Sequence, residues 1–231
     1  MIPLWDKIPR SSFPVITLAL IAANCLVFFL ELSAAPPQRE QLIALYALVP
    51  ARSTTMLTGS PVGFPGAVLP LFTSMFLHGG WLHLIGNMWF LWIFGDNVED
   101  RVGHGRYLLL YLAGGLAGAL THWFFNLNSE VPTVGASGAI AAVMGAYLIT
   151  FPRARIVTLA PIIIFITTIE IPAYLMLLYW MLLQFLSGVA SIGVADPMQG
   201  GIAFFAHVGG FIAGIPLMLL LRRRRSRAAS W

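Results

Sequence analysis

The chain has 231 residues, of which 58% are hydrophobic and only 10% are charged, and its mean hydropathy is +0.84. Soluble domains carry about 25% charged residues, so this composition excludes a water-soluble globular protein and indicates an integral membrane protein. The 13 Lys and Arg residues exceed the 9 Asp and Glu residues, but they cluster in particular loops, which indicates orientation in a membrane and excludes nucleic-acid binding. The single cysteine, Cys25, excludes an internal disulfide.

The first candidate membrane span covers residues 13–32, which are largely apolar and follow Lys7 and Arg10. A segment of about twenty residues crosses a hydrocarbon core of ~30 Å. The segment also fits a signal peptide, because residues 33–35 resemble a cleavage site, but its apolar run exceeds the usual ~7–15 residues. We therefore expect a retained helix, and both interpretations place residues 33–70 in a loop on the outer side of the membrane.

The outer loop is rich in Pro, Gly, Ser and Thr, and its short apolar stretch at residues 42–49 predicts an interfacial helix. The second span is expected at residues 81–98 and carries His83 and Asn87 in its outer half. The third span is expected at residues 107–125, where two glycines have the spacing of four that lets membrane helices pack closely.

The fourth span is expected at residues 137–151 and begins with Ser137. Residues 156–170 are apolar and β-branched but too short for a span, and Pro161 interrupts them, so we expect an interfacial hairpin or loop there. The fifth and sixth spans follow at residues 171–190 and 203–221.

The distribution of basic residues favours six spans, because cytoplasmic loops carry an excess of Lys and Arg. With six spans both termini are cytoplasmic and only Arg39 and Arg52 lie outside, whereas a seventh span would place the termini on opposite sides. The chain is thus predicted to be an all-α integral membrane protein, a six-helix bundle forming a single domain over residues 1–231. Eleven of the thirteen basic residues then lie inside: Lys7, Arg10, Arg101, Arg106, Arg153, Arg155, Arg222, Arg223, Arg224, Arg225 and Arg227.

Helix lengths place three polar residues at one depth. The helix from Ser137 to Phe151 reaches only ~22 Å at 1.5 Å per residue, less than the ~30 Å core, so the serine lies below the outer surface. Counting back from the inner ends of the sixth and second spans puts His207 and His83 within about a turn of that depth, and Asn87 one turn deeper. Polar residues are costly in lipid and normally face a protein interior or a water-filled cavity, so this cluster predicts a functional site.

A serine and a histidine at one depth predict nucleophilic catalysis, in which the histidine takes the serine proton and His83 and Asn87 donate to the oxyanion. Gly210 and Gly214 lie on the face of His207 and let two helices pack nearly backbone to backbone. The sequence places no carboxylate at this depth, so the pair is expected to act as a dyad of neutral groups, which are cheaper to bury. The missing carboxylate also disfavours a metal site, and no metal or cofactor is expected.

These residues resemble the motifs of the rhomboid family of intramembrane serine proteases. The resemblance covers roughly residues 70–220 and implies a six-helix fold, a catalytic dyad of Ser137 and His207, and oxyanion donors in His83, Asn87 and the Ser137 backbone N–H. The family patterns GxSG, AHxxGxxxG and HxxxxHxxxN are matched by Gly135-Ala-Ser-Gly138, by Ala206-His207 with Gly210 and Gly214, and by His78 with His83 and Asn87.

Two positions depart from the family pattern. Many members carry Trp-Arg in the outer loop, where this chain has Leu69 and Pro70. Some members carry an aromatic residue one turn after the serine that stacks on the histidine, where this chain has Ala141. Another group must therefore orient His207.

Other interpretations of the same residues remain open. Small residues in membrane helices mostly serve packing, and a serine among them often bonds to a backbone carbonyl. A transporter or channel would also line a cavity with polar groups, but internal repeats are not found. A catalytically inactive relative would be expected to lack Ser137 or His207. We expect transmembrane protein substrates, cut near their outer boundary, in a bilayer that the loop lengths suggest is a bacterial inner membrane; the oligomeric state is not predicted.

Overall fold

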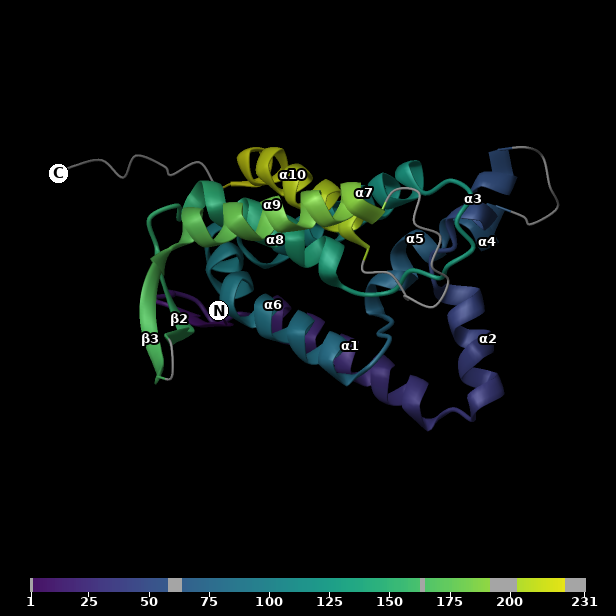
Figure 1. Cartoon of the computed structure of the whole chain (residues 1–231), viewed down its shortest axis with the longest axis horizontal. Helices are drawn as coiled ribbons and strands as arrows, with labels where there is room; N and C mark the ends of the chain where they lie inside the picture. The colour runs from purple at the N-terminus through teal and green to yellow at the C-terminus, as the bar shows by residue number, and fades with distance from the viewer. Residues whose placement is uncertain (1, 58–63, 163–164, 192–202, 223–231) are drawn as a thin grey trace.

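The computed structural model describes residues 2–57, 64–162, 165–191 and 203–222. Helix α8 is central among the long helices (Figure 1): α1 and α6 pair on one side of it, α9 and α10 pair on the other, and α7 packs against both α8 and α10. Each of the six apolar segments expected from the sequence is helical. The long helices are α1 (Val15–Ser33), α6 (Trp81–Val102), α7 (His104–Phe125), α8 (Ser137–Thr150), α9 (Ala173–Ser191) and α10 (Phe204–Leu221).

Four of these helices, α1, α7, α9 and α10, are long and apolar enough to cross a membrane. The helix α6 meets the same test only together with the preceding segment Gly66–Phe76, from which it is bent by 78°. The helix α8 has 14 residues and is too short to be counted. The described residues thus hold four candidate spans, or five with the bent pair, because α6 carries many polar residues and α8 is short.

The central helix α8 is buried continuously from Gly138 to Tyr147. Its neighbours approach so closely that side chains are excluded at the contacts. A Cβ atom added at Gly210 would lie 2.0 Å from the carbonyl oxygen of Gly138, and one added at Gly214 would lie 2.0 Å from that of Ala142. On the other side, a Cβ atom at Gly114 of α7 would lie 2.2 Å from the Ala142 methyl carbon. Glycines on two neighbouring helices therefore fix the position of α8.

The segment between α1 and α6 is helical over much of its described length. The interfacial helix expected at residues 42–49 lies earlier, at α2, whose first residues are prolines that favour a helix start. A backbone pair between Leu48 and Thr133, with N···O distances of 3.1 and 2.8 Å, joins this segment to the loop before α8. The short helices are α2 (Pro36–Tyr46), α3 (Pro50–Leu57), α4 (Phe64–Val68), α5 (Pro70–Thr73) and the 3₁₀ helix η1 (Ser74–Phe76).

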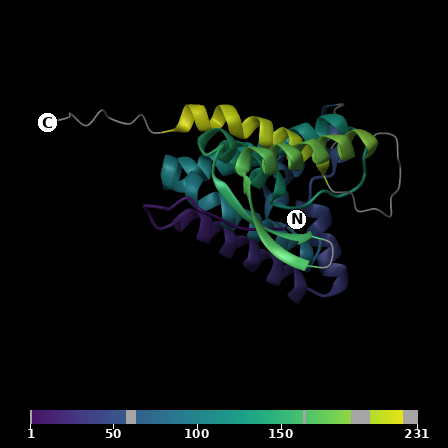
Figure 2. The ribbon, with the colours of Figure 1, turned by 60° about the vertical axis from the view of Figure 1, so that its left-hand side comes forward.

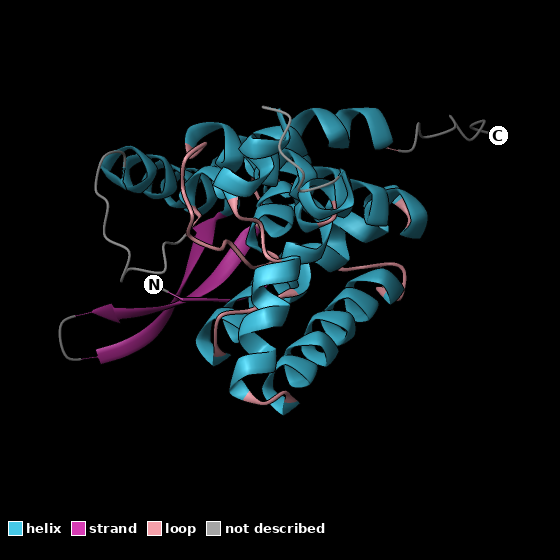
Figure 3. Cartoon of the chain, turned by 90° about the vertical axis from the view of Figure 1, so that its right-hand side faces the viewer, coloured by secondary structure: helices cyan, strands magenta, loops and turns pink. Residues whose placement is uncertain are grey.

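A three-stranded antiparallel sheet projects from one end of the bundle (Figures 2 and 3). The segment expected as a hairpin or loop at 156–170 forms the hairpin of β2 (Arg155–Ile162) and β3 (Phe165–Pro172). The strand β1 (Ile2–Asp6) pairs with β2 and was not expected. The prediction of an all-α protein is therefore corrected. The β-branched residues of β2 and β3 suit strands, and pairing between the two strands satisfies their backbone N–H and C=O groups.

The sheet is tied to the helices α6 and α8 through β1. The Asp6 carboxylate accepts hydrogen bonds from the Tyr147 hydroxyl of α8 and, at 2.8 Å, from the Asn97 amide of α6. Beside it, the buried Glu99 carboxylate accepts bonds of 2.8 Å from the backbone N–H groups of Ile16 and Thr17. These two bonds satisfy donors at the first turn of α1, which would otherwise lack partners.

Candidate functional site

Ser137 is the first residue of α8, and an unusual backbone turn leads to it. Gly135 has a φ of 127°, in the region that favours glycine, and its N–H donates to the Ser74 carbonyl at 2.8 Å. This turn directs the serine side chain toward α10. The Ser137 Oγ and the His207 Nε2 lie 2.7 Å apart, within hydrogen-bond distance.

His207 lies on α10, is only 8% exposed and is held on both of its ring nitrogens. Its Nδ1 lies 2.6 Å from the side-chain oxygen of Gln184 on α9. The ring of Trp180, one turn earlier on α9, lies 5.6 Å from the imidazole centroid at an interplanar angle of 34°. These contacts supply the orientation that Ala141, lacking an aromatic ring, does not provide.

Gln184 and Trp180 were missed in the sequence analysis, although a signal was present. The two residues are spaced by four, which places them on one helix face together with the buried Leu177 and Gly188. Gln184 is the only amide side chain in this apolar helix. A lone amide on the inward face of a membrane helix is costly unless it finds a partner.

The α6 residues His83 and Asn87 approach the backbone just before the serine. A Cβ atom added at Gly135 would lie 2.7 Å from the His83 Nε2 and 3.6 Å from the Asn87 Nδ2. Their polar atoms therefore face the turn that leads into Ser137. The structure brings together all four residues for which a chemical role was expected.

His78 is fully buried and contacts the side chain of Asn87. Its Nε2 lies 3.0 Å from the Asn87 amide nitrogen, and its Nδ1 lies 3.3 Å from the Phe76 carbonyl oxygen. A carbonyl can only accept, so Nδ1 carries the proton and Nε2 accepts from the Asn87 amide. The first histidine of the HxxxxHxxxN pattern thus positions the asparagine.

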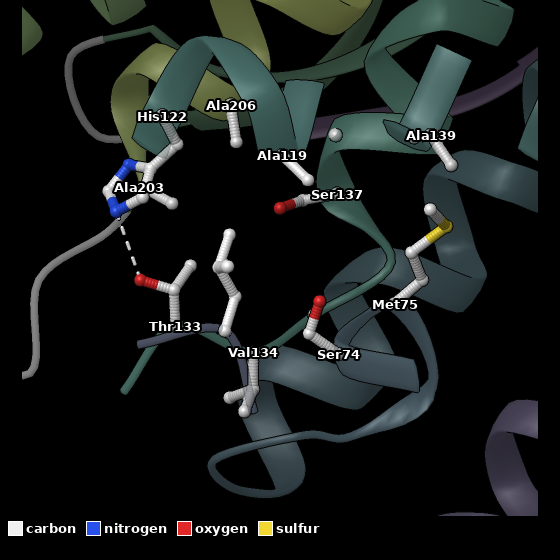
Figure 4. Close-up of a pocket in the computed structure, with 14 residues that line it drawn as sticks. Ser74, Met75, Ala119, His122, Thr133, Val134, Ser137, Ala139, Ala203 and Ala206 are labelled. Atoms are coloured by element: carbon white, nitrogen blue, oxygen red, sulfur yellow. Dashed lines mark hydrogen bonds between the residues drawn. The ribbon is translucent and has the colours of Figure 1, made fainter. Parts of the chain in front are cut away.

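Two cavities meet at the serine. The larger is a cleft of about 930 Å³ between α6 and α9. The smaller, of about 30 Å³, lies behind Ser137, where the labelled side chains of Ser74, Val134 and Ala206 surround the hydroxyl (Figure 4). At its edge the His122 Nε2 lies 3.0 Å from the Thr133 hydroxyl. The cleft is lined by Leu82, His83, Gly86, Asn87, Phe90, Ser137, Trp180 and His207, among others.

The glycines expected to support the site lie at the contact between α8 and α10. A Cβ atom at Gly138 would lie 3.4 Å from the Ala206 carbonyl oxygen, and Gly210 and Gly214 pack against the α8 backbone. A larger residue at Gly210 or Gly214 would force α8 and α10 apart. Within the described part of the chain no three His, Cys, Asp or Glu residues are grouped as a metal site would need.

Comparison with known proteins places this arrangement in a family. The chain matches the model of the Rhomboid domain over residues 65–224. Among similar proteins are the rhomboid protease GluP of Bacillus subtilis, 35% identical over 140 residues (60% of this chain and 25% of that protein), and RHOMBOID-like protein 1 of Arabidopsis thaliana, 30% identical over 196 residues (85% and 45%).

A third similar protein is the mitochondrial presenilin-associated rhomboid-like protein A of Danio rerio, 33% identical over 100 residues, or 42% of this chain and 26% of that protein. The matched region spans less than half the length of each of these relatives. The family match covers more than half of this chain and includes every helix from α6 to α10. The chain therefore belongs to the rhomboid family and is a multi-pass integral membrane protein.

Proposed function

We propose that the protein is an intramembrane serine endopeptidase that cleaves transmembrane segments through a dyad of Ser137 and His207. The observation that carries the proposal is the 2.7 Å contact between Ser137 Oγ and His207 Nε2, made between two helices at the edge of a cleft. A serine beside a histidine that a third group orients is the arrangement of an activated nucleophile. The name of the Bacillus relative, a rhomboid protease, agrees with this chemistry.

In the first step the Ser137 oxygen attacks the substrate carbonyl carbon while its proton passes to His207 Nε2. The carbonyl oxygen becomes an oxyanion, for which the Ser137 backbone N–H, His83 and Asn87 are the proposed donors. His207 then gives the proton to the leaving amine, and the carbon–nitrogen bond breaks. A water molecule, deprotonated by His207, hydrolyses the resulting ester and regenerates the serine hydroxyl.

The proposed substrate is a transmembrane helix that enters the cleft from the lipid and unwinds near its outer boundary. A helix hides its carbonyl groups in internal hydrogen bonds, and breaking them in lipid would leave them without partners. The cleft of about 930 Å³ is large enough for a short extended segment. The cavity behind Ser137, of about 30 Å³, has room for only a small group, so we expect Ala or Ser just before the cleaved bond.

The proposal is tested by reconstituting the protein in lipid vesicles with a fluorescent transmembrane substrate and following cleavage. The parent protein is expected to cleave, whereas Ser137→Ala and His207→Ala should show no cleavage while keeping the parent's thermal unfolding midpoint. Cleavage by purified Ser137→Ala at a rate comparable to the parent would refute the assignment.

A further inference from the structure

The catalytic histidine has a partner on each ring nitrogen, and the partner on Nδ1 bears on which of the two nitrogens carries the proton. Nε2 faces Ser137, so Nδ1 faces away from the nucleophile, toward Gln184. A neutral imidazole carries one proton, and the nitrogen without it accepts hydrogen bonds. Nε2 can take the serine proton only if the imidazole proton is on Nδ1. The group beside Nδ1 therefore decides whether the dyad is competent.

We propose that Gln184 is a positioning residue, whose side-chain oxygen accepts the Nδ1–H of His207 and so presents Nε2 to Ser137 as the proton acceptor. The proposal rests on the proposed protease function. The 2.6 Å separation of Gln184 Oε1 and His207 Nδ1 is that of a well-formed hydrogen bond. When Nε2 takes the serine proton, the imidazolium keeps its Nδ1–H bonded to the same oxygen, so no rearrangement is needed.

An amide is suited to this position because the site lies among apolar helices. In soluble serine hydrolases a carboxylate holds the corresponding nitrogen, but a buried charge in lipid costs several kcal/mol or more. Gln184 is partly buried on the inward face of α9, between that helix and α10. A neutral acceptor keeps the orientation without the charge.

Trp180 completes the support from the same helix. Its ring lies beside the imidazole at 5.6 Å and also lies 6.2 Å from the Phe211 ring of α10. Both orienting contacts of His207 thus come from α9. Only 17% of the membrane-spanning part of α9 is buried inside the protein, against 44% for α10. The alignment of the dyad therefore depends on the packing of α9, the least buried of the four candidate spans.

The test compares two substitutions of nearly equal size. Gln184→Met keeps the length of the side chain but removes the acceptor, whereas Gln184→Glu keeps an acceptor and removes the amide's ability to donate. We expect Gln184→Met to lower kcat and the rate of fluorophosphonate labelling of Ser137 by about 10- to 100-fold, part of the ~10²–10⁴ that a positioned general base contributes. KM should stay within about twofold of the parent, because no substrate contact is removed.

Gln184→Glu should retain clearly more activity than Gln184→Met, because its carboxyl oxygen still accepts from Nδ1–H. The matched control is Leu183→Met, at a position 42% exposed on the same helix, which should behave as the parent does. If Gln184→Met reduces the yield of folded protein, Gln184→Asn, which withdraws the amide by one methylene, should show the same selective loss of kcat.

Two outcomes would overturn the positioning role. One is parental kcat and labelling rate in Gln184→Met, and the other is an equal loss in Gln184→Met and Gln184→Glu, which would indicate packing or amide donation instead. Failure of the protease assignment is a different result, in which the parent is not labelled at Ser137 at all. A parent labelled at Ser137 with a fully active Gln184→Met refutes only the role of Gln184.

Discussion

Within the described part of the chain, the groups in contact with the His207 ring are neutral: the Ser137 hydroxyl, the Gln184 amide and the Trp180 ring. Buried neutral groups with hydrogen-bond partners cost far less than buried charges. A site of this kind can therefore be kept among apolar helices without destabilising them.

Asn87 is expected to contribute to rate more than to substrate binding. Removing one oxyanion donor typically lowers turnover by ~10²–10³, and in Asn87→Ala the effect should fall toward the lower end because His83 and the Ser137 N–H remain. Steady-state kinetics should show the loss in kcat with little change in KM. The control is Asn24→Ala, which removes a fully buried amide of α1 that bonds to the Leu20 carbonyl and should leave kcat unchanged. An increase in KM alone would make Asn87 a binding residue.

Sequence reasoning reached Ser137, His207, His83 and Asn87 because helix length converts position in the chain into depth. It did not reach Gln184, although the lone amide of an apolar helix was a signal, because helix length does not show which side of that helix faces the site. The face of α9 is set by its packing against α10, which only the structure provides. The contact between His78 and Asn87 could not be predicted either, because it joins a loop to a helix.

At the scale of secondary structure elements, the contact between α8 and α10 brings the serine and the histidine together. Both helices lack side chains where they touch, at Gly138 and Gly210. The glycine positions could be predicted from their spacing relative to Ser137 and His207. The strand β1 could not, because five residues at the start of a chain form a strand only when another strand is available to pair with them.

Gly210→Ala is expected to abolish most activity by separating these helices. The added methyl carbon would lie 2.0 Å from the Gly138 carbonyl oxygen, so α10 must move, and a displacement of about 1 Å in an active site can cost ~10²-fold in rate. Cleavage and Ser137 labelling should both fall by about that factor. Gly105→Ala, where an added Cβ atom meets nothing within 4 Å, should retain parental activity. Parental activity in Gly210→Ala would show that the close contact is not required.

The attachment of β1 predicts a dependence of stability on pH. Burial raises the pKa of the Asp6 carboxyl above its ordinary value of 3.8, while bonds from Tyr147 and Asn97 act in the opposite direction. The folded protein thus binds the Asp6 proton more readily than the unfolded chain does. Its contribution to the free energy of unfolding therefore falls as pH rises from about 3.8 through the folded pKa.

Asp6→Asn should remove this dependence while keeping an acceptor for Tyr147. The thermal unfolding midpoint of the parent, relative to Asp6→Asn, should be lower at pH 7 than at pH 4. Glu170→Gln is the control, because Lys7 lowers the pKa of the exposed Glu170, which gives a dependence of opposite sign and small size. A difference between parent and Asp6→Asn that stays constant with pH would contradict the argument.

At the scale of the whole molecule, the cleft between α6 and α9 is the proposed place of entry for a substrate helix. The depth of the serine below the membrane surface remains a prediction, which follows from the 14-residue length of α8. Composition predicted the membrane location, and the family match agrees with it. The number of spans remains a prediction, because α6 and α8 do not meet a length-and-apolarity test on their own.

Substrate choice is expected to depend on how easily the outer end of a helix unwinds. Replacing Gly, Pro or polar residues near the outer boundary of a cleaved transmembrane substrate with Leu should slow cleavage, because Leu favours the helical state and so raises the free energy of unwinding. Separately, enlarging the residue before the cut to Phe should block cleavage at that bond, because the cavity behind Ser137 has a volume of only about 30 Å³. Mass spectrometry of the products gives both results. Undiminished cleavage of both variants at the original bond would show that unwinding and fit do not select the substrate.

The most direct test of the central claim is to label the purified protein with a fluorophosphonate probe and locate the adduct by mass spectrometry. The probe reacts with an activated serine and needs no transmembrane substrate. The proposed dyad predicts one adduct, on Ser137, whose rate of formation falls by ~10²–10⁴ in folded His207→Ala. A parent protein without an adduct at Ser137, or equal labelling rates in the parent and His207→Ala, would contradict it.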